Sequence, residues 1–200
     1  GMPSFSSTGA SLLALQCIGF RTICTTENAG PVHNMSELAG KTIRITEGPV
    51  FLDDYNAWGA APVSMSASEI MPALQNGTID GQENPLSNIY SASLQDVQKY
   101  LSLTGHMYDA APFVCNMDWF NSLPTEYQEI LMEEAKNARE VDLEESDENK
   151  YLELLKEAGM EVNEVDKEAF QAKVDGVWAD YASQYADGQS WIDLATSFNK

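Results

Sequence analysis

The chain has 200 residues, and its 31 Asp and Glu against 11 Lys and Arg give a formal net charge of -20 at pH 7. Nucleic-acid binding needs clustered basic residues, and the basic residues here form no run, so we exclude nucleic acid as a partner. No apolar run in the sequence is long enough to span a bilayer.

The first part of the chain reads as a helix followed by a strand. Apolar residues recur at helical spacing in 11–18, which predicts a helix there. The β-branched stretch that follows predicts a strand over 22–26. Ser36 is expected to cap a single helical turn that Gly40 ends.

The next segment, 42–46, alternates between apolar and polar residues and predicts a strand. Ile43 and Ile45 fall on one face of this strand, and Arg44 falls on the other. We therefore expect Arg44 to point away from the core that Ile43 and Ile45 enter.

Further elements follow at short intervals. The patterns predict a helix over 49–58, a strand over 62–65, a helix over 66–75 that begins with a capping box of Ser66 and Glu69, a strand over 78–81, a helical or irregular segment over 85–95, and extended segments over 97–108 and 111–117. Beyond them we expect one long helix over 124–158, a strand over 160–163, a helix over 166–185 and a last helix from about 190. Short strands alternating with helices indicate an α/β fold.

Three segments carry a family resemblance. They read LAGKTIRI at 38–45, SEIMPALQNGTIDGQENP at 68–85, and VQKYLSLTGH at 97–106. In this order and spacing they resemble the solute-binding proteins of TRAP-type transporters, also called the DctP type. The resemblance covers the chain more loosely from about residue 19 to its end.

The resemblance implies a fold like that of the type II periplasmic binding proteins. On this interpretation the chain is mainly the second of two lobes, with a long bridging helix, and the first lobe is largely missing. Lobe two is expected to span 19–109 and 151–200. Residues 110–150 would be the returning strand and long helix of lobe one, and 1–18 would be a segment outside the family. A pocket between two lobes would then be half a pocket.

The resemblance also implies a ligand site. The arginine of the isoleucine-arginine strand, here Arg44, would grip the carboxylate of a small organic acid, because a guanidinium donates two parallel hydrogen bonds to a planar carboxylate. Asn84 would donate from its amide, Arg21 would contact or support the ligand, and Glu47 would line the pocket. Arg21 has an alternative role, a structural ion pair with Glu27 or another acid.

One departure from the family leaves the ligand class open. The family often has a pocket-facing aromatic residue two positions after Met65, and Ala67 stands there instead. The two histidines, His33 and His106, are far from each other and from the cysteines in sequence, so we expect both to be structural.

Two other function classes remain open for such a chain. An enzyme would use paired carboxylates such as Asp53 with Asp54 or Asp80 with Glu83 as acid and base, but chance pairs are expected in so acidic a chain. The sequence contains no nucleophile elbow and no phosphate-binding glycine loop, and its three cysteines lack the spacing of a metal site. We therefore expect no enzyme activity, no cofactor and no metal. The third class is a non-binding remnant or interaction module of the same fold.

The expected partners follow from the resemblance. They are a small carboxylate-containing solute and the membrane subunits of a TRAP transporter, met in the periplasm or elsewhere outside the cytoplasm. We also expect a homodimer through residues 110–158, because the apolar strand over 111–117 would otherwise leave its edge unpaired.

Overall fold

The computed structural model of the protein describes residues 8–197. Its elements are, in chain order, β1 (Ala10–Thr25), α1 (Met35–Leu38), β2 (Thr42–Ile45), α2 (Pro49–Ala57), β3 (Ala61–Ser64), α3 (Ala67–Gln75), β4 (Gly81–Pro85), α4 (Leu86–Ser91), a 3₁₀ turn at Leu94–Asp96, β5 (Tyr100–Asn116), α5 (Met117–Ser122), α6 (Thr125–Glu145), α7 (Glu148–Glu157), β6 (Glu161–Asn163), α8 (Lys167–Ala182) and α9 (Gly188–Ser197). The strands form one sheet in the order β3-β2-β4-β1-β5-β6. The α/β prediction is confirmed.

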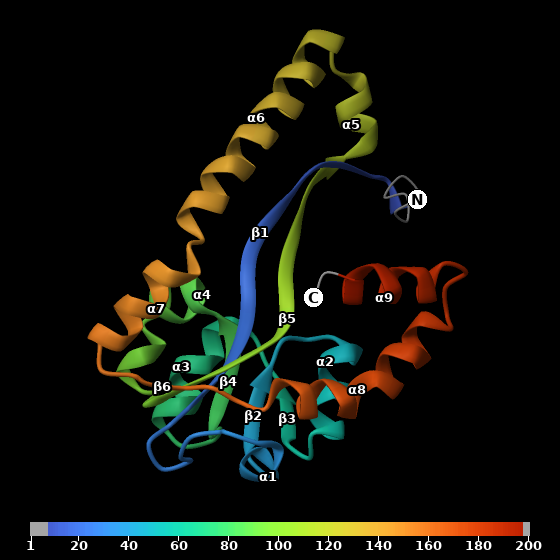
Figure 1. The fold of residues 1–200 in the computed structure, drawn as a ribbon. Helices are drawn as coiled ribbons and strands as arrows, with labels where there is room; N and C mark the ends of the chain where they lie inside the picture. The colour runs from blue at the N-terminus through green and yellow to red at the C-terminus, as the bar shows by residue number, and fades with distance from the viewer. Residues whose placement is uncertain (1–7, 198–200) are drawn as a thin grey trace.

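The sheet is mixed, and both of its faces are covered. β2 runs parallel to β3 and β4, whereas β1 runs antiparallel to β4 and β5 (Figure 1). One hydrophobic cluster contains buried residues of α3, α4 and α7, and the other contains buried residues of α1, α2 and α8. Since helices pack on both faces, a polar side chain in the middle of this sheet is buried whichever way it points.

β1 and β5 continue beyond the other strands as a two-stranded ribbon. They pair from Ala10 with Asn116 down to Thr25 with Tyr100, whereas β4 pairs with β1 only from Arg21 onward. The long helix α6 runs back beside this ribbon toward the sheet (Figure 1). No helix within 8–197 is long and apolar enough to cross a membrane.

The prediction of a helix over 11–18 is wrong, because these residues form the first half of β1. Their partner lies about a hundred positions later, in the segment 110–116, which the sequence correctly predicts to be extended. The two extended segments expected over 97–108 and 111–117 are one strand, β5. The strand over 111–117 is therefore paired for most of its length within its own chain.

Two other boundaries differ from the prediction. Asn34 rather than Ser36 caps α1, since its side-chain oxygen accepts hydrogen bonds from the main-chain N–H groups of residues 36 and 37. The strand expected over 78–81 begins only at Gly81. The capping box of Ser66 and Glu69 is confirmed.

The predicted bridging helix over 124–158 is broken into α6 and α7. The break lies at residues 146 and 147, where Asp147 caps the second helix. A carboxylate on each side of the break contacts β1: Asp142 Oδ2 accepts from Cys17 N at 2.9 Å, and Glu148 Oε1 accepts from Phe20 N at 2.7 Å. These bonds tie the helix to the ribbon where one continuous helix was expected.

Gly19 lies where Glu148 approaches β1. Its φ of +118° is a conformation that other residues rarely adopt, and a Cβ built on it would lie 3.1 Å from Glu148 Oε1. The sequence of β1 also shifts register against β5 between Cys17 and Gly19. The ribbon therefore bends at the same level as the helix break.

Gly81 is predicted to be the least replaceable glycine of the sheet. A Cβ on Gly81 would lie 2.3 Å from the carbonyl oxygen of Cys24, so Gly81→Ala forces main chain apart and should destabilise the protein by about 2–3 kcal/mol. The matched control is Gly176→Ala in α8, which meets nothing within 4 Å and should stabilise the chain by about 0.5–1 kcal/mol. Urea unfolding measures both, and an unchanged midpoint for Gly81→Ala would contradict the expectation.

Candidate functional site

Two predicted site residues, Arg44 and Asn84, lie on the same face of neighbouring strands. Arg44 in β2 is the register partner of Gln82 in β4, and Asn84 lies two positions beyond Gln82. Side chains of paired residues, and of residues two apart, share a face of a sheet. The prediction that Arg44 points away from Ile43 and Ile45 is consistent with this register.

Arg44 is 5 % exposed, because helices cover this face too. Its Nε and Nη2 donate to the carbonyl oxygen of Met65 at 3.0 and 2.8 Å, and its Nη1 lies 3.5 Å from the Thr46 hydroxyl. Burial lowers the pKa of Arg44, and the negative charge of Glu83 partly opposes that effect. Within residues 8–197 no carboxylate forms an ion pair with its guanidinium.

Arg21 differs from Arg44 because its charge is neutralised within the chain. It is 3 % exposed and forms ion pairs with Glu83 and Asp109. Its Nη2 also donates to Thr46 Oγ1 and to Asn84 Oδ1, both at 3.2 Å. Burial lowers the pKa of Arg21, but the hydrogen bond and charge of Glu83 outweigh this and leave the pKa raised. The alternative expected for Arg21 was a structural ion pair with Glu27 or another acid; the acids that pair with it are Glu83 and Asp109, whereas Glu27 is exposed and forms no ion pair with Arg21 within residues 8–197.

Glu83 is the centre of a buried polar cluster. It is fully buried, and its carboxylate accepts from Arg21 and from the main-chain N–H of Thr46 at 3.3 Å. His106 Nε2 lies 3.6 Å from Glu83 and 3.4 Å from the Tyr55 hydroxyl. Burial would raise the pKa of Glu83, but hydrogen bonds from His106 and Arg21 and the charge of Arg21 hold it below its ordinary value.

Thr46 joins the two arginines, since its hydroxyl accepts from Arg21 and lies within reach of Arg44. The next residue, Glu47, is exposed, and the structure gives its side chain no contact with Arg21, Arg44 or Asn84. Three of the four predicted ligand-binding residues therefore form one cluster, and Glu47 lies beside its edge at the end of β2.

The residues that the sequence did not assign to the site are Glu83, Asp109 and His106. Glu83 had a usable signal, because an acid inside the strand GQENP, between apolar segments, requires a buried partner. Asp109 and His106 had none, since their roles depend on the pairing of β1 with β5. Three of the four acids considered for an enzyme have other partners: Asp80 accepts from Thr42 N at 2.8 Å, Asp53 accepts from the Tyr181 hydroxyl at 3.0 Å, and Glu83 pairs with Arg21. Asp54 differs, because its Oδ1 is buried without a hydrogen-bond partner among the described residues, and burial together with the charge of Asp53 raises its pKa to about 7.

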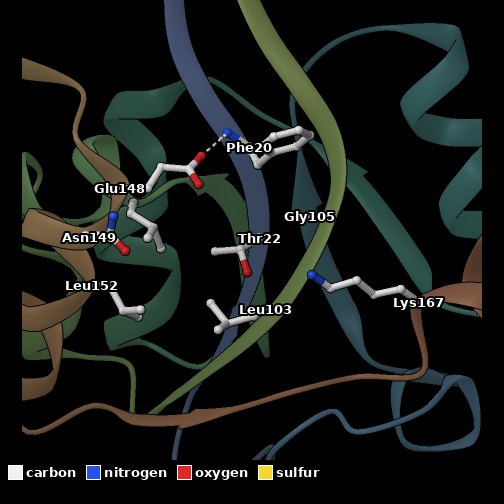
Figure 2. Close-up of a pocket in the computed structure, with 9 residues that line it drawn as sticks. Phe20, Thr22, Leu103, Gly105, Glu148, Asn149, Leu152 and Lys167 are labelled. Atoms are coloured by element: carbon white, nitrogen blue, oxygen red, sulfur yellow. Dashed lines mark hydrogen bonds between the residues drawn. The ribbon is translucent and has the colours of Figure 1, made fainter. Parts of the chain in front are cut away.

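A cavity of about 240 Å³ lies at the base of the ribbon, against α4 and α7 (Figure 2), on the sheet face that carries Thr22 and its register partner Asn84. Its lining consists of Phe20, Thr22, Leu86, Leu103, Gly105, Glu148, Asn149, Leu152 and Lys167. None of the four predicted ligand-binding residues is among them. Within residues 8–197 no group of three or more His, Cys, Asp or Glu side chains is placed to hold a metal ion.

The sequence matches the family described as bacterial extracellular solute-binding protein, family 7, over residues 2–184. The match includes most of the segment 1–18 that we expected to lie outside the family, of which residues 1–7 are outside the described part of the chain. The chain is therefore similar to this family from near its first residue.

Individual relatives agree with this match. A solute-binding protein of Verminephrobacter eiseniae is 36% identical over 184 residues, which are 90% of this chain and 54% of the relative. The 2,3-diketo-L-gulonate-binding periplasmic protein YiaO of Escherichia coli is 34% identical over 84% of this chain and 51% of its own length. A TRAP periplasmic solute-binding protein of Polaromonas sp. JS666, solved with D-erythronate, is 32% identical with a TM-score of 0.87, and the alignment covers 95% of this chain and 62% of that one. The chain thus spans about half the length of these curated relatives.

Proposed function

Because the chain belongs to the family of bacterial extracellular solute-binding proteins, family 7, we propose that it is the solute-binding component of a TRAP-type transporter and holds the carboxylate of a small organic acid through Arg44. One observation carries the proposal: Arg44 is a buried guanidinium with no ion-pair partner in the described part of the chain. A buried charge without a counter-ion is costly. A bound carboxylate supplies that counter-ion.

The neighbouring residues have graded roles in this proposal. Asn84 donates from its amide to an oxygen of the solute. Arg21 supports the site, because its charge is already taken up by Glu83 and Asp109 while its Nη2 holds Asn84 Oδ1. Glu47, exposed at the end of β2, lines the mouth of the pocket and accepts from solute hydroxyl groups.

The proposed solute class is a hydroxylated monocarboxylic acid. The Escherichia coli relative is named for 2,3-diketo-L-gulonate and the Polaromonas relative was solved with D-erythronate, both of which carry one carboxylate and several further oxygen atoms. One buried guanidinium without a partner matches one carboxylate. An acidic Glu47 beside the site would repel a second carboxylate, so a dicarboxylate is the less favoured solute.

Calorimetric titration with a panel of sugar acids and dicarboxylates tests this function. In a version of the protein that carries a complete first lobe, we expect a sugar acid such as D-erythronate to bind and succinate to bind more weakly. Binding by the 200-residue chain alone is expected to be weak or absent, because the chain spans about half the length of its curated relatives and a site between two lobes would be closed from one side only. A complete protein that binds none of the panel would favour the non-binding remnant, and turnover of any compound would favour an enzyme.

We propose further that the protein works in the periplasm or elsewhere outside the cytoplasm, delivers its solute to the membrane subunits of the transporter and catalyses no reaction. The family consists of transport solute-binding proteins, which are not enzymes.

The 200-residue chain is also proposed to form a homodimer through residues 110–158. The ribbon and α6 expose apolar side chains that a soluble monomer would normally cover, namely Phe113, Val114, Tyr127, Ile130, Met132, Val141 and Leu143. Sedimentation at micromolar concentration should give the mass of a dimer, and Ile130→Glu with Val141→Glu should shift it to monomer. The exposed Leu52 of α2 gives the matched control, Leu52→Glu, which should leave the dimer intact. A monomer for the parent chain would contradict the proposal.

A further inference from the structure

A line of side-chain amides runs through the sheet behind Asn84. Asn84 Nδ2 donates to Gln82 Oε1, Gln82 Nε2 donates to Gln98 Oε1 at 3.0 Å, and Gln98 Nε2 donates to the carbonyl oxygen of Cys24 at 2.8 Å. Gln82 is fully buried and Gln98 is 4 % exposed. These hydrogen bonds are therefore shielded from water, where a lost partner is not replaced by solvent.

The direction of every bond in this line is fixed from both of its ends. At one end Arg21 Nη2 donates to Asn84 Oδ1 at 3.2 Å, and a guanidinium has donors only. At the other end the main-chain carbonyl of Cys24 can only accept. An amide turned over anywhere between them would place donor against donor and acceptor against acceptor.

We infer that Gln82 and Gln98 are positioning residues that hold the Asn84 amide in one orientation, with its oxygen toward Arg21 and its second N–H presented to the solute. The inference rests on the proposed function for the identity of what that N–H meets. One Nδ2 proton is used by Gln82, so the other is free to bind an acceptor. The site then selects a carboxylate or hydroxyl oxygen at this position and disfavours an ammonium group.

Gln98 reaches Asn84 only through Gln82 in the described structure, and this gives the inference a sharp test that needs no solute. We expect Gln98→Met, which keeps the side-chain length and removes the amide, to shift the side-chain NH₂ signals of Asn84 by more than a linewidth in nitrogen-15 NMR spectra of the 200-residue chain. Gln75→Met at the exposed end of α3 is the matched control and should leave those signals in place. Unmoved Asn84 signals in a folded Gln98→Met variant would overturn the inference.

A measurement on the unmodified chain covers the case in which Gln98→Met does not fold. The hydrogen-bonded side-chain amide protons of Gln82 and Gln98 should exchange with water at least about tenfold more slowly than the amide protons of Gln75, because both side chains are buried and each donates one hydrogen bond within the line of amides. Equal exchange rates would show that the line of bonds is not formed in solution, and the inference would fall.

Measurements of solute binding separate this inference from the proposed function. In a version with a complete first lobe, Gln98→Met should weaken solute binding about fivefold, the usual worth of one neutral hydrogen bond. In an Asn84→Ala background the same change should have no further effect, because Gln98 acts through Asn84. If the affinity losses of Gln98→Met and Asn84→Ala were additive, the inference that Gln98 acts through Asn84 would be overturned. If Gln98→Met shifts the Asn84 signals as expected but the complete protein binds no solute, the proposed function is rejected and the line of amides stands.

Discussion

Glu83→Gln is expected to destabilise the protein by about 3–5 kcal/mol, the usual cost of removing one partner from a buried ion pair. Glu83 is fully buried and serves as counter-ion to Arg21, with His106 also in contact. Glutamine keeps the shape but leaves the Arg21 charge with Asp109 alone, at the partly exposed side of the cluster. Urea unfolding monitored by tryptophan fluorescence gives the change.

The control for Glu83→Gln is Glu153→Gln, which removes a carboxylate paired with Lys156 on the surface of α7. Exposed pairs contribute roughly 0–1 kcal/mol, so this variant should unfold close to the parent. Equal stability of the two variants would mean that Glu83 is not the counter-ion of Arg21.

Acid should act on the same interaction. The pKa of Glu83 is lowered in the folded protein, so the stability it contributes is complete above the ordinary glutamate pKa of about 4.3 and is lost as the pH falls through the lower folded value. The parent should therefore lose stability below about pH 4 more steeply than Glu83→Gln does. Parallel curves for the two proteins would contradict the assignment.

Arg44→Ala should weaken solute binding by about 30-fold or more, since truncating a buried charged hydrogen-bonding partner costs about 2–5 kcal/mol. The measurement is calorimetric titration of a version with a complete first lobe, using a sugar acid that the parent binds. Arg44→Lys keeps the charge but loses the two parallel N–H donors of the guanidinium, so its affinity for the solute should fall between those of the parent and Arg44→Ala.

Arg139→Ala on α6 is the matched arginine deletion, because among the described residues Arg139 forms an ion pair only with its neighbour Glu140. It should leave the affinity unchanged. If Arg44→Ala titrates like the parent while its urea midpoint is also unchanged, Arg44 does not hold the carboxylate.

Where local pattern decided the fold, the sequence predicted it well. The helix that starts at Pro49 and the capping box of Ser66 depend on neighbours a few positions away. β1 depends on residues a hundred positions later, and its register shifts between Leu12 and Ala14 and between Cys17 and Gly19 interrupt the two-residue alternation of a strand. The interrupted pattern resembled helical spacing, which explains the error over 11–18.

The site residues differ in the same way, because some depend on local sequence and others on distant parts of the chain. Arg44 and Asn84 could be named because they stand in short motifs, and strand alternation gave the direction of Arg44 relative to Ile43. The ion pairs of Arg21 could not be read from sequence, because Glu83 and Asp109 lie 62 and 88 positions from it. An acidic chain offers many carboxylates, and only the fold determines which two form ion pairs with Arg21.

The change from six strands to two gives the molecule an uneven stiffness. A wide sheet covered by helices resists bending, whereas a two-stranded ribbon is compliant, so an applied load is taken up where the ribbon leaves the sheet. Arg21 lies at that junction and is bonded to Glu83 on the stiff side and to Asp109 on the compliant side. A tilt of the ribbon formed by β1 and β5 changes the distance between Arg21 and Asp109 (Figure 1). The ion pair between these two residues therefore resists the tilt.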